Sequence, residues 1–332
     1  MAFASRLLPL RRPPEVSVLI PAYMAEAFID RTLHFARGQT FPRIKILVSV
    51  DAGEDQTAEI VRRHEDQDKR IVLHSQPKRL GWAGNVNYLL ERVDTPYFFI
   101  YFHDDILLPQ YTEKLLAVLT QNASAAGVYC DLCQFGATQR VSTGPAYTGS
   151  LMQRLLTLML SLERGSPLRA LLRSAHASHL RLPDRPGAGF WANEPFLMDM
   201  VAAGPLEQVP EVLYMRWNNR PGGLTDGWKK LPLAEATKGW HANIEARLEL
   251  IARMVDDEHE RRALRFALFL HAFPAMQTLL QASDGETLKS PADVHPLFAS
   301  PDTPEAVAGY GNPIAAFARE RYTFCMSQGL YE

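Results

Sequence analysis

The chain has 332 residues, 47% of them hydrophobic and 10% aromatic, which is enough for one large domain or two modest ones with a buried core. The formal net charge of -2 gives no overall field that would attract nucleic acid, so we expect no nucleic-acid partner. Three cysteines, without a second pair or a histidine cluster at zinc spacing, predict structural thiols, with a redox or metal role as the alternative.

The N-terminal segment 1–14 is an extension with basic residues and only a broken apolar patch, too short for a signal-peptide core. No later apolar run approaches the roughly 20 residues of a membrane span. We therefore expect a cytoplasmic protein, with peripheral contact at the inner face of the membrane left open.

Residues 15–135 alternate short β-branched or aromatic runs with helical periodicity. Strands are predicted at 16–23, 44–50, 70–74, 97–102 and 127–132, and helices at 25–36, 57–66, 83–92 and 110–121. Strands that are apolar almost throughout, joined by helices, indicate a parallel sheet covered on both faces. The expected class is therefore α/β, with a Rossmann-like, mostly parallel sheet flanked by helices.

The pattern changes after residue 135. The stretch "LMQRLLTLMLSLERG" (151–165) predicts an amphipathic helix that packs on the core, with a membrane-surface or acceptor-docking role as the alternative. Residues 136–229 form a second half of the α/β region, and 230–332 an α-helical appendage. Within that appendage, Pro274 is expected to kink or end its helix.

Polar residues follow four of the predicted strands. Open parallel sheets bind ligands at the carboxyl ends of their strands, so these residues predict one crevice. They are Ala22 and Tyr23, Asp51, Lys78 and Arg79, and the run His103, Asp104 and Asp105. Cations ahead of a helix suit phosphate oxygens, although loop cations are often only solvated. The two adjacent carboxylates suit a divalent cation on a diphosphate, with a solvated turn or a helix N-cap as the alternative.

Taken in order, these motifs resemble the inverting family 2 glycosyltransferases of the GT-A fold. The resemblance covers roughly residues 15–135, and a weaker similarity covers 190–220. The segments that carry the first are "VSVLIPAY", "QTFP", "VSVDAGEDQT", "RLGWAGNVN" and "YFFIYFHDDILLP". The resemblance implies that 15–135 bind a nucleotide sugar, and that 136–229 hold the acceptor side with the catalytic base and a closing loop.

The resemblance also implies roles for single residues. Pro21, Ala22 and Tyr23 would line the nucleotide pocket, and Asp51 would contact the base, which is expected to be uracil. Asp104 would bind Mn²⁺ or Mg²⁺, with His103 as a possible helper. Asp105 would face the sugar, and Asn87 matches the Asn of the family's Arg-Asn pair. Lys78 and Arg79 would contact phosphate.

Four positions depart from the family pattern. Met24 replaces an Asn, Val50 and Phe102 each replace the first Asp of a motif, and Val86 replaces an Arg. Phe102 matters most, because a phenylalanine cannot bind a metal. The sequence therefore predicts either a metal held by Asp104 without a second aspartate or nucleotide binding with weak metal dependence.

For the catalytic base, "GFWANEPFLMDMVAAG" matches the family segment that begins a helix after the acceptor loop. Glu194, ten residues before Gly204, is the expected base, with Asp199 as the fallback and a helix-start glutamate as the structural alternative. In "VLYMRWNNRPGGLTDGW", Arg216 and Arg220 are expected near the diphosphate, and Trp217 or Trp228 against a sugar or base.

The expected function is transfer of a sugar from a nucleotide sugar to a saccharide, lipid-linked or small-molecule acceptor. A nucleotidyltransferase or a dinucleotide oxidoreductase would need a glycine-rich motif after the first strand, and "IPAYMAEAF" lacks one. The alternative from another class is a non-catalytic nucleotide- or carbohydrate-binding protein that has decayed from the transferase pattern.

Overall fold

A computed structural model describes residues 13–327 apart from 14, 162–165, 178, 184–189, 219, 286 and 301. The described strands are β1 Val16–Ala22, β2 Ile44–Val50, β3 Ile71–Ser75, β4 Tyr97–Ile100, β5 Ile106–Leu107, β6 Gly127–Gly136, β7 Arg140–Ser142, β8 Leu171–Arg173 and β9 Leu206–Asn218. The described α-helices are α1 Ile29–Arg37, α2 Thr57–Gln67, α3 Gly81–Leu90, α4 Tyr111–Gln121, α5 Leu151–Leu160, α6 Ser174–Ala177, α7 Asn193–Ala203, α8 Leu224–Lys229, α9 Leu233–Met254, α10 Glu258–Ala282 and α11 Asn312–Ser327. Short 3-10 helices lie at η1 Pro167–Arg169, η2 Pro291–Asp293, η3 Pro296–Phe298 and η4 Pro304–Tyr310.

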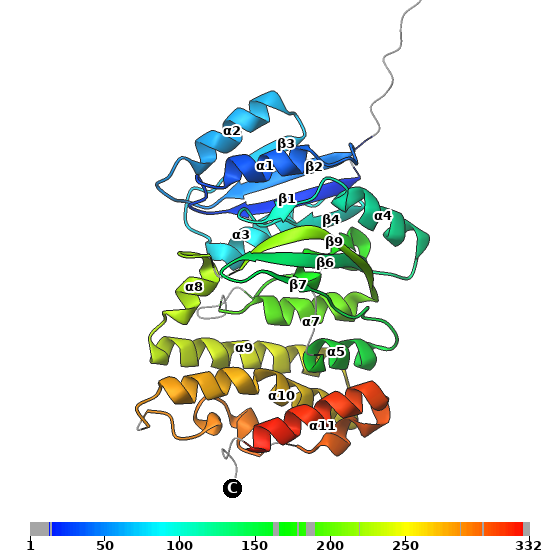
Figure 1. Ribbon diagram of the computed structural model, residues 1–332, viewed down its shortest axis with the longest axis vertical. Helices are drawn as coiled ribbons and strands as arrows, with labels where there is room; N and C mark the ends of the chain where they lie inside the picture. The colour runs from blue at the N-terminus through cyan, green and yellow to red at the C-terminus, as the bar shows by residue number, and fades with distance from the viewer. Residues whose placement is uncertain are drawn as a thin grey trace, which may run out of the picture.

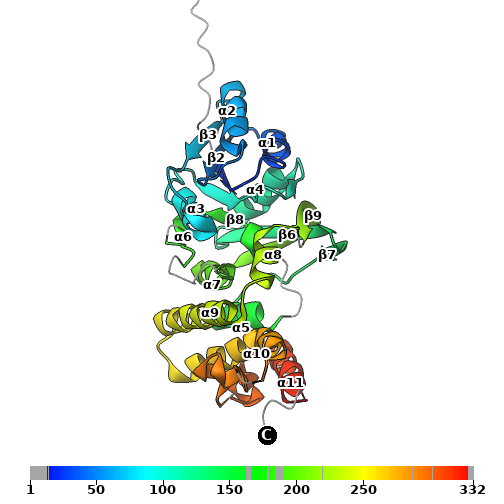
Figure 2. The same ribbon diagram turned by 90° about the vertical axis from the view of Figure 1, so that its left-hand side faces the viewer.

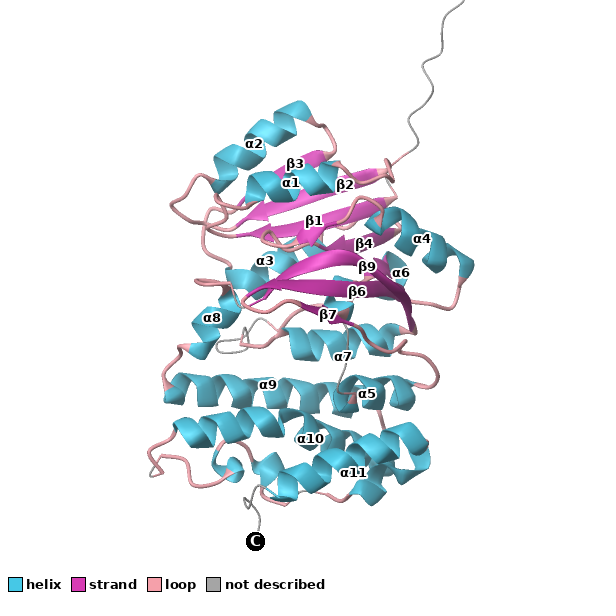
Figure 3. Ribbon diagram, viewed as in Figure 1, coloured by secondary structure: helices cyan, strands magenta, loops and turns pink. Residues whose placement is uncertain are grey.

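One sheet joins the described strands in the order β3-β2-β1-β4-β8-β6-β9-β5, with β7 paired to β6 (Figures 1 and 3). Strands β3, β2, β1 and β4 are parallel, whereas β8 is antiparallel to both of its neighbours. Every residue of β1 is buried, as expected for a strand covered on both faces. The predicted α/β class with a mostly parallel, Rossmann-like sheet is confirmed.

Helices cover both faces of the sheet and divide the core into two clusters. On one face, α1, α2 and α4 contribute apolar side chains such as Ile29, Leu33 and Leu115. On the other face, α3 packs on β1 and β2, and its apolar residues join a larger cluster with α5, α7, α9 and α10. The predicted helix at 25–36 begins later, at Ile29, because residues 25–28 form a turn in which the Ala25 N–H donates to Thr57 Oγ1 (2.8 Å).

The sheet continues across the expected boundary at residue 135. Strands β8 and β9 come from the second segment, yet β8 lies between β4 and β6, and β9 pairs with β6 and β5. The buried β6 also carries Cys130, and burial raises the pKa of this thiol to about 12. Cys130 is therefore a structural residue of the sheet rather than a reactive thiol.

Helix α9 lies beside α5 on the side of α7 away from β3, and α10 and α11 stack beyond both (Figures 1 and 2). Helix α10 is long and apolar enough to cross a membrane by length and composition, but 61% of its apolar window is buried inside the molecule. Of the two expected effects of Pro274, a kink or an end of its helix, the end is not found, because α10 continues through Pro274 to Ala282. Phe273 and Met276, which flank Pro274 in the sequence, are buried, and burial of such apolar side chains offsets part of the cost of about 3 kcal/mol for an internal proline.

Candidate active site

A cavity of about 370 Å³ opens where the parallel strands end. Seven of the predicted donor-site residues line it: Pro21, Ala22, Tyr23, Asp51, Arg79, His103 and Asp104. Its remaining wall comes from α3 and from the segment 220–228, which is distant in sequence. The expectation that several strand ends form one crevice is therefore met by the geometry. Lys78 and Asn87 are absent from the lining.

Asp51 organises the floor of this donor-side cavity. Its carboxylate is 2% exposed and accepts hydrogen bonds from the backbone N–H groups of Leu80 (2.7 Å) and Gly81 (2.9 Å). The Arg79 guanidinium lies 3.4 Å from the same carboxylate and 3.4 Å above the centre of the Tyr23 ring. Asp51 thus holds the start of α3 and, through Arg79, the edge of the cavity in place.

Helix α3 separates two asparagines onto different faces, because residues two apart do not share a helix face. Asn85 points toward the sheet, where its amide donates to the Ala22 and Ser49 carbonyls (3.2 and 3.1 Å), and it lines the cavity. Asn87 instead pairs with the backbone of Leu182, donating to its oxygen (2.9 Å) and accepting from its N–H (2.8 Å). The sequence places both asparagines on this helix, but the family resemblance pointed to Asn87, and Asn85 is the one that lines the cavity.

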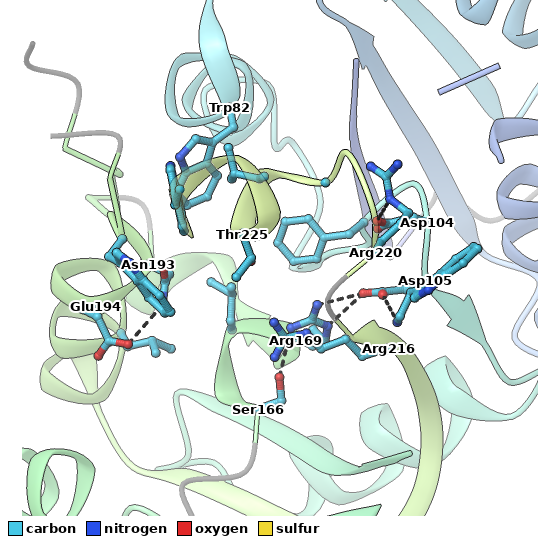
Figure 4. A pocket seen from close by; sticks show the side chains of 18 of the residues that line it. Trp82, Asp104, Asp105, Ser166, Arg169, Asn193, Glu194, Arg216, Arg220 and Thr225 are labelled. Carbon is cyan, nitrogen blue, oxygen red and sulfur yellow. Dashed lines mark hydrogen bonds and ion pairs between the residues drawn. The ribbon is translucent and has the colours of Figure 1, made fainter. Parts of the chain in front are cut away.

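Asp104 faces the cavity and forms an ion pair with Arg220. The Arg220 Nε lies 2.7 Å from Asp104 Oδ2, and both side chains are mostly buried (Figure 4). The guanidinium also stacks 4.7 Å from the centre of the Phe28 ring. The pair stands where the two cavities of the site meet, because both residues line each of them.

The residues around Asp104 fit a divalent cation through one carboxylate and one imidazole. His103 Nδ1 lies 3.1 Å from the Pro21 carbonyl, which only accepts, so Nδ1 carries a proton, and in the neutral ring Nε2 is the nitrogen with the lone pair. That buried Nε2 has no hydrogen-bond partner among the described residues. Phe102 lines the cavity and supplies no ligand. An imidazole and a carboxylate suit Mn²⁺ better than Mg²⁺, which prefers oxygen alone.

Asp105, in contrast, is almost fully buried and links three distant segments, while its side chain also forms part of the wall of a second, adjoining cavity. Its Oδ2 accepts from Arg169 Nε (3.1 Å), Arg169 Nη2 (2.8 Å) and Tyr214 Oη (2.9 Å), and its Oδ1 accepts from the Trp217 N–H (2.9 Å). Burial, with the charge of Asp105, raises the pKa of Tyr214 well above its usual range, so this phenol stays a donor. Asp105 is 1% exposed, and its oxygens are occupied by the protein. It holds β5, η1 and β9 together beside the cavities.

A second cavity, of about 290 Å³, adjoins the first and is lined by Trp82, Trp191 and Trp228 together with Arg169, Arg216 and Glu194. The rings of Trp191 and Trp228 lie 5.4 Å apart. Trp191 has a φ of 51°, a conformation that non-glycine residues rarely adopt, and its ring stacks on Trp240 of α9. Aromatic faces of this kind are suited to stacking against a sugar ring. We call this the acceptor-side cavity.

Figure 4 shows Glu194 and Asp104 on opposite sides of the acceptor-side cavity. Glu194 is 8% exposed at the start of α7, and its Oε1 accepts from Asn193 Nδ2 (3.2 Å). The fallback Asp199, one turn further along α7, pairs with Arg253 (2.5 Å) and is absent from the cavity lining.

Arg216 and Arg169 give the floor of the acceptor-side cavity a positive character. Burial, together with the charge of Arg169, lowers the pKa of Arg216. An anionic ligand in the cavity would offset the cost of this buried charge. Arg216 was expected near the diphosphate from the sequence. Arg169 was not predicted as a site residue, because it lies in η1 between stretches without a motif.

His241, Glu245 and His295 form another group of metal-type ligands, all within 4.8 Å of one another. His295 Nδ1 accepts from the Leu297 N–H (3.0 Å), so the neutral ring carries its proton on Nε2 and donates to Glu245 (2.8 Å). A ring with this tautomer cannot bind a metal through Nε2. The group is therefore a structural cap in the helical region.

The model of the family described as Glycosyl transferase family 2 matches residues 17–174. An uncharacterized glycosyltransferase of Haemophilus influenzae is 32% identical over 121 residues, which cover 36% of this chain and 38% of that protein. The putative teichuronic acid biosynthesis glycosyltransferase TuaG of Bacillus subtilis is 30% identical over 112 residues, which cover 34% of this chain and 44% of TuaG. The matches thus span less than half the length of these relatives.

Among solved structures, S. aureus TarS 1-349 superposes with a TM-score of 0.68 at 13% identity, over 96% of this chain and 92% of that chain. Its complex with UDP gives a TM-score of 0.67. At this identity the likeness shows a shared fold, which includes the C-terminal helices. The strand-end motifs, the sheet and the matched residues agree: residues 17–174 match glycosyl transferase family 2, and the chain has the GT-A fold.

Proposed function

We propose that this protein transfers a sugar from a nucleotide sugar, most naturally a UDP-sugar, to an acceptor hydroxyl by a single displacement that inverts the anomeric carbon. The observation that carries the proposal is the pair of adjoining cavities with the Asp104–Arg220 pair at their junction. One cavity is formed at the strand ends, where nucleotides bind in folds of this class, and the other holds aromatic rings and a carboxylate.

In the donor-side cavity, the nucleotide lies between the end of β1 and the start of α3. Tyr23, stacked under Arg79, offers a face for the base, and Asp51 retains acceptor capacity beyond its backbone partners because a carboxylate has about four acceptor sites. The structure of TarS with UDP supports UDP as the nucleotide to test first. Lys78, outside the cavity lining, is left as a solvated loop cation.

Asp104 and His103 would hold Mn²⁺ or Mg²⁺. Such an ion, when bound, neutralises charge on the leaving diphosphate. Arg220 supplies positive charge of its own at the junction of the cavities, and Arg216 supplies it in the wall of the acceptor-side cavity. When a diphosphate enters, Arg220 can exchange its bond with Asp104 for bonds with phosphate oxygens.

In the displacement, the acceptor oxygen forms a bond to the anomeric carbon as the bond from that carbon to the diphosphate oxygen breaks. The electron pair of the broken bond leaves with the diphosphate, and the acceptor proton passes to the Glu194 carboxylate. Base assistance of this kind typically contributes ~10²- to 10⁴-fold. Trp191 and Trp228 orient a saccharide acceptor by stacking, in preference to a lipid-linked or small-molecule acceptor.

The biological setting that fits is synthesis of a cell-surface polysaccharide, in the cytoplasm or at the inner face of the membrane. The name of the relative TuaG, which refers to teichuronic acid biosynthesis, supports this setting.

The test is calorimetric titration with UDP and GDP, with and without Mn²⁺, on the wild type and on Asp104→Ala. Metal-dependent binding of one nucleotide that is lost in the variant supports the donor site. Transfer is then measured as release of nucleoside diphosphate in the presence of saccharide acceptors. Absence of binding to either nucleotide would contradict the proposal.

Phe102, in the place of a metal-binding aspartate, favours a second candidate: a nucleotide-binding protein without catalysis. Nucleotide binding together with no turnover on any UDP-sugar would identify it.

A further inference from the structure

Glu194 has a partner in the C-terminal helical region. His271, on α10, lies with Nε2 3.1 Å from Glu194 Oε2, and the two side chains are 10% and 9% exposed. The other ring nitrogen, Nδ1, lies 3.1 Å from the carbonyl oxygen of Met159, near the end of α5. The imidazole therefore bridges α5 and α7 from a third helix.

The chemistry of the two contacts determines where the protons lie. A backbone carbonyl only accepts, so His271 Nδ1 carries a proton. Nε2 faces a carboxylate oxygen, and the contact is favourable only if one proton lies between them. The pair is thus an imidazolium with a carboxylate, or an imidazole with a carboxylic acid. The first form is the charge-assisted one.

We propose that His271 is a positioning residue for Glu194: it fixes the rotamer of the carboxylate and stabilises its ionised form for proton abstraction. This inference rests on the proposed function, in which Glu194 is the base. It assigns a part of the catalytic machinery to the helical region 230–332, for which the sequence had offered no role. Glu194 and His271 are 77 residues apart in the sequence, so it is the packing of α10 against α5, which itself packs against α7, that brings them together.

The proton balance is simple. Before the reaction, the Nε2–H of the imidazolium donates a hydrogen bond to the ionised Glu194 carboxylate and keeps its proton. During the displacement, the acceptor O–H bond breaks and its proton binds the carboxylate, which becomes a neutral acid. After the glycosylated product leaves, that proton passes to water and the ion pair forms again.

The experiment uses the full chain with four variants: His271→Phe, His271→Gln, Glu194→Gln and the double variant of Glu194→Gln with His271→Phe. Phenylalanine keeps the ring volume without donors, and the glutamine amide restores a donor to the carboxylate. His259→Gln, at an exposed site on the same helix, is the matched control. UDP affinity and the denaturant midpoint report whether each variant is folded.

We expect His271→Phe to lower kcat by about tenfold to a hundredfold, the range in which outer partners of active-site groups act. The KM for the donor and the affinity for UDP should stay within twofold, and His271→Gln should recover most of the rate. In the Glu194→Gln background, His271→Phe should cause no further loss of kcat, because the effects of substituting two residues that act as one unit do not add.

Unchanged kcat in His271→Phe, or a full additional loss in the double variant, would overturn the inference. Failure of the proposed function looks different: Glu194→Gln itself would then keep its rate. If His271→Phe does not fold, His271→Gln and the double variant of Glu194→Gln with His271→Gln carry the same comparison.

Discussion

Replacing Asp105 by alanine should destabilise the protein more than any other change at the site. The carboxylate is 1% exposed and accepts two hydrogen bonds from Arg169, one from Tyr214 and one from the Trp217 backbone. The Arg169 side chain is only 10% exposed, so the variant leaves a buried cation without its counter-charge. Breaking a buried pair in this way costs about 3–5 kcal/mol.

The measurement is equilibrium unfolding in urea, with turnover followed in parallel. Asp105→Ala should lower the unfolding midpoint strongly. The double change of Asp105→Ala with Arg169→Met should recover much of the loss, because it removes both charges from the interior. Asp104→Ala is the matched control: the neighbouring carboxylate has a more exposed pair with Arg220, at 20% and 16%, and its loss should cost clearly less.

This prediction separates two roles for Asp105. The family resemblance implies a carboxylate that faces the sugar, whereas in the structure its oxygens accept hydrogen bonds from Arg169, Tyr214 and the Trp217 backbone at the wall of the acceptor-side cavity. A normal urea midpoint for Asp105→Ala, combined with loss of turnover, would refute the structural argument and restore the catalytic role.

Three further predictions concern charge. Arg220→Ala should weaken metal-free UDP binding by about tenfold or more in calorimetry, since a hydrogen bond to a charged group contributes about 1.5–3 kcal/mol; equal affinity would remove Arg220 from the diphosphate site. The hydrogen bond from Arg70 lowers the pKa of Asp68 to about 2, against an ordinary value of 3.8. Its stabilisation is therefore present above pH 4 and lost as the pH falls toward 2, so Asp68→Asn should cost up to about 2 kcal/mol at neutral pH and flatten the acid limb of the stability curve. Cys130, whose pKa burial raises to about 12, should resist alkylation at pH 8 in the folded protein and react only on unfolding; fast labelling in native buffer would contradict its burial.

Much of the fold could be predicted because hydrophobic patterns within a few residues indicate each strand and helix. Runs such as 44–50 and 57–66 have the length and periodicity of a buried strand and an amphipathic helix, and β2 and α2 follow them closely. The placement of Ala22, Asp51 and His103 followed from one rule, that parallel strands end at the same edge of the sheet. No long-range information was needed for that step.

Two neighbouring residues with the same chemistry show what the local sequence pattern could not predict. Asp104 and Asp105 are adjacent in the turn between β4 and β5, yet Asp104 pairs with Arg220 where the two cavities meet, whereas the oxygens of Asp105 are occupied by a buried cluster. This difference depends on β9 and η1, which supply Tyr214 and Arg169 from far along the chain.

The sequence by itself determined the strands and helices of the first 135 residues, their order along the chain and the ligand-binding edge, since hydrophobic periodicity and turn residues act over a few positions, whereas the insertion of β8 and β9 into the sheet was decided by the tertiary structure. Only the tertiary structure decided the partner of each charged group: Arg220 for Asp104, Arg169 for Asp105 and His271 for Glu194, at separations of 116, 64 and 77 residues. A charge in a cavity wall is stabilised by whichever opposite charge or dipole the packing brings within hydrogen-bond distance. That outcome depends on how loops and helices meet in space, which local periodicity does not encode.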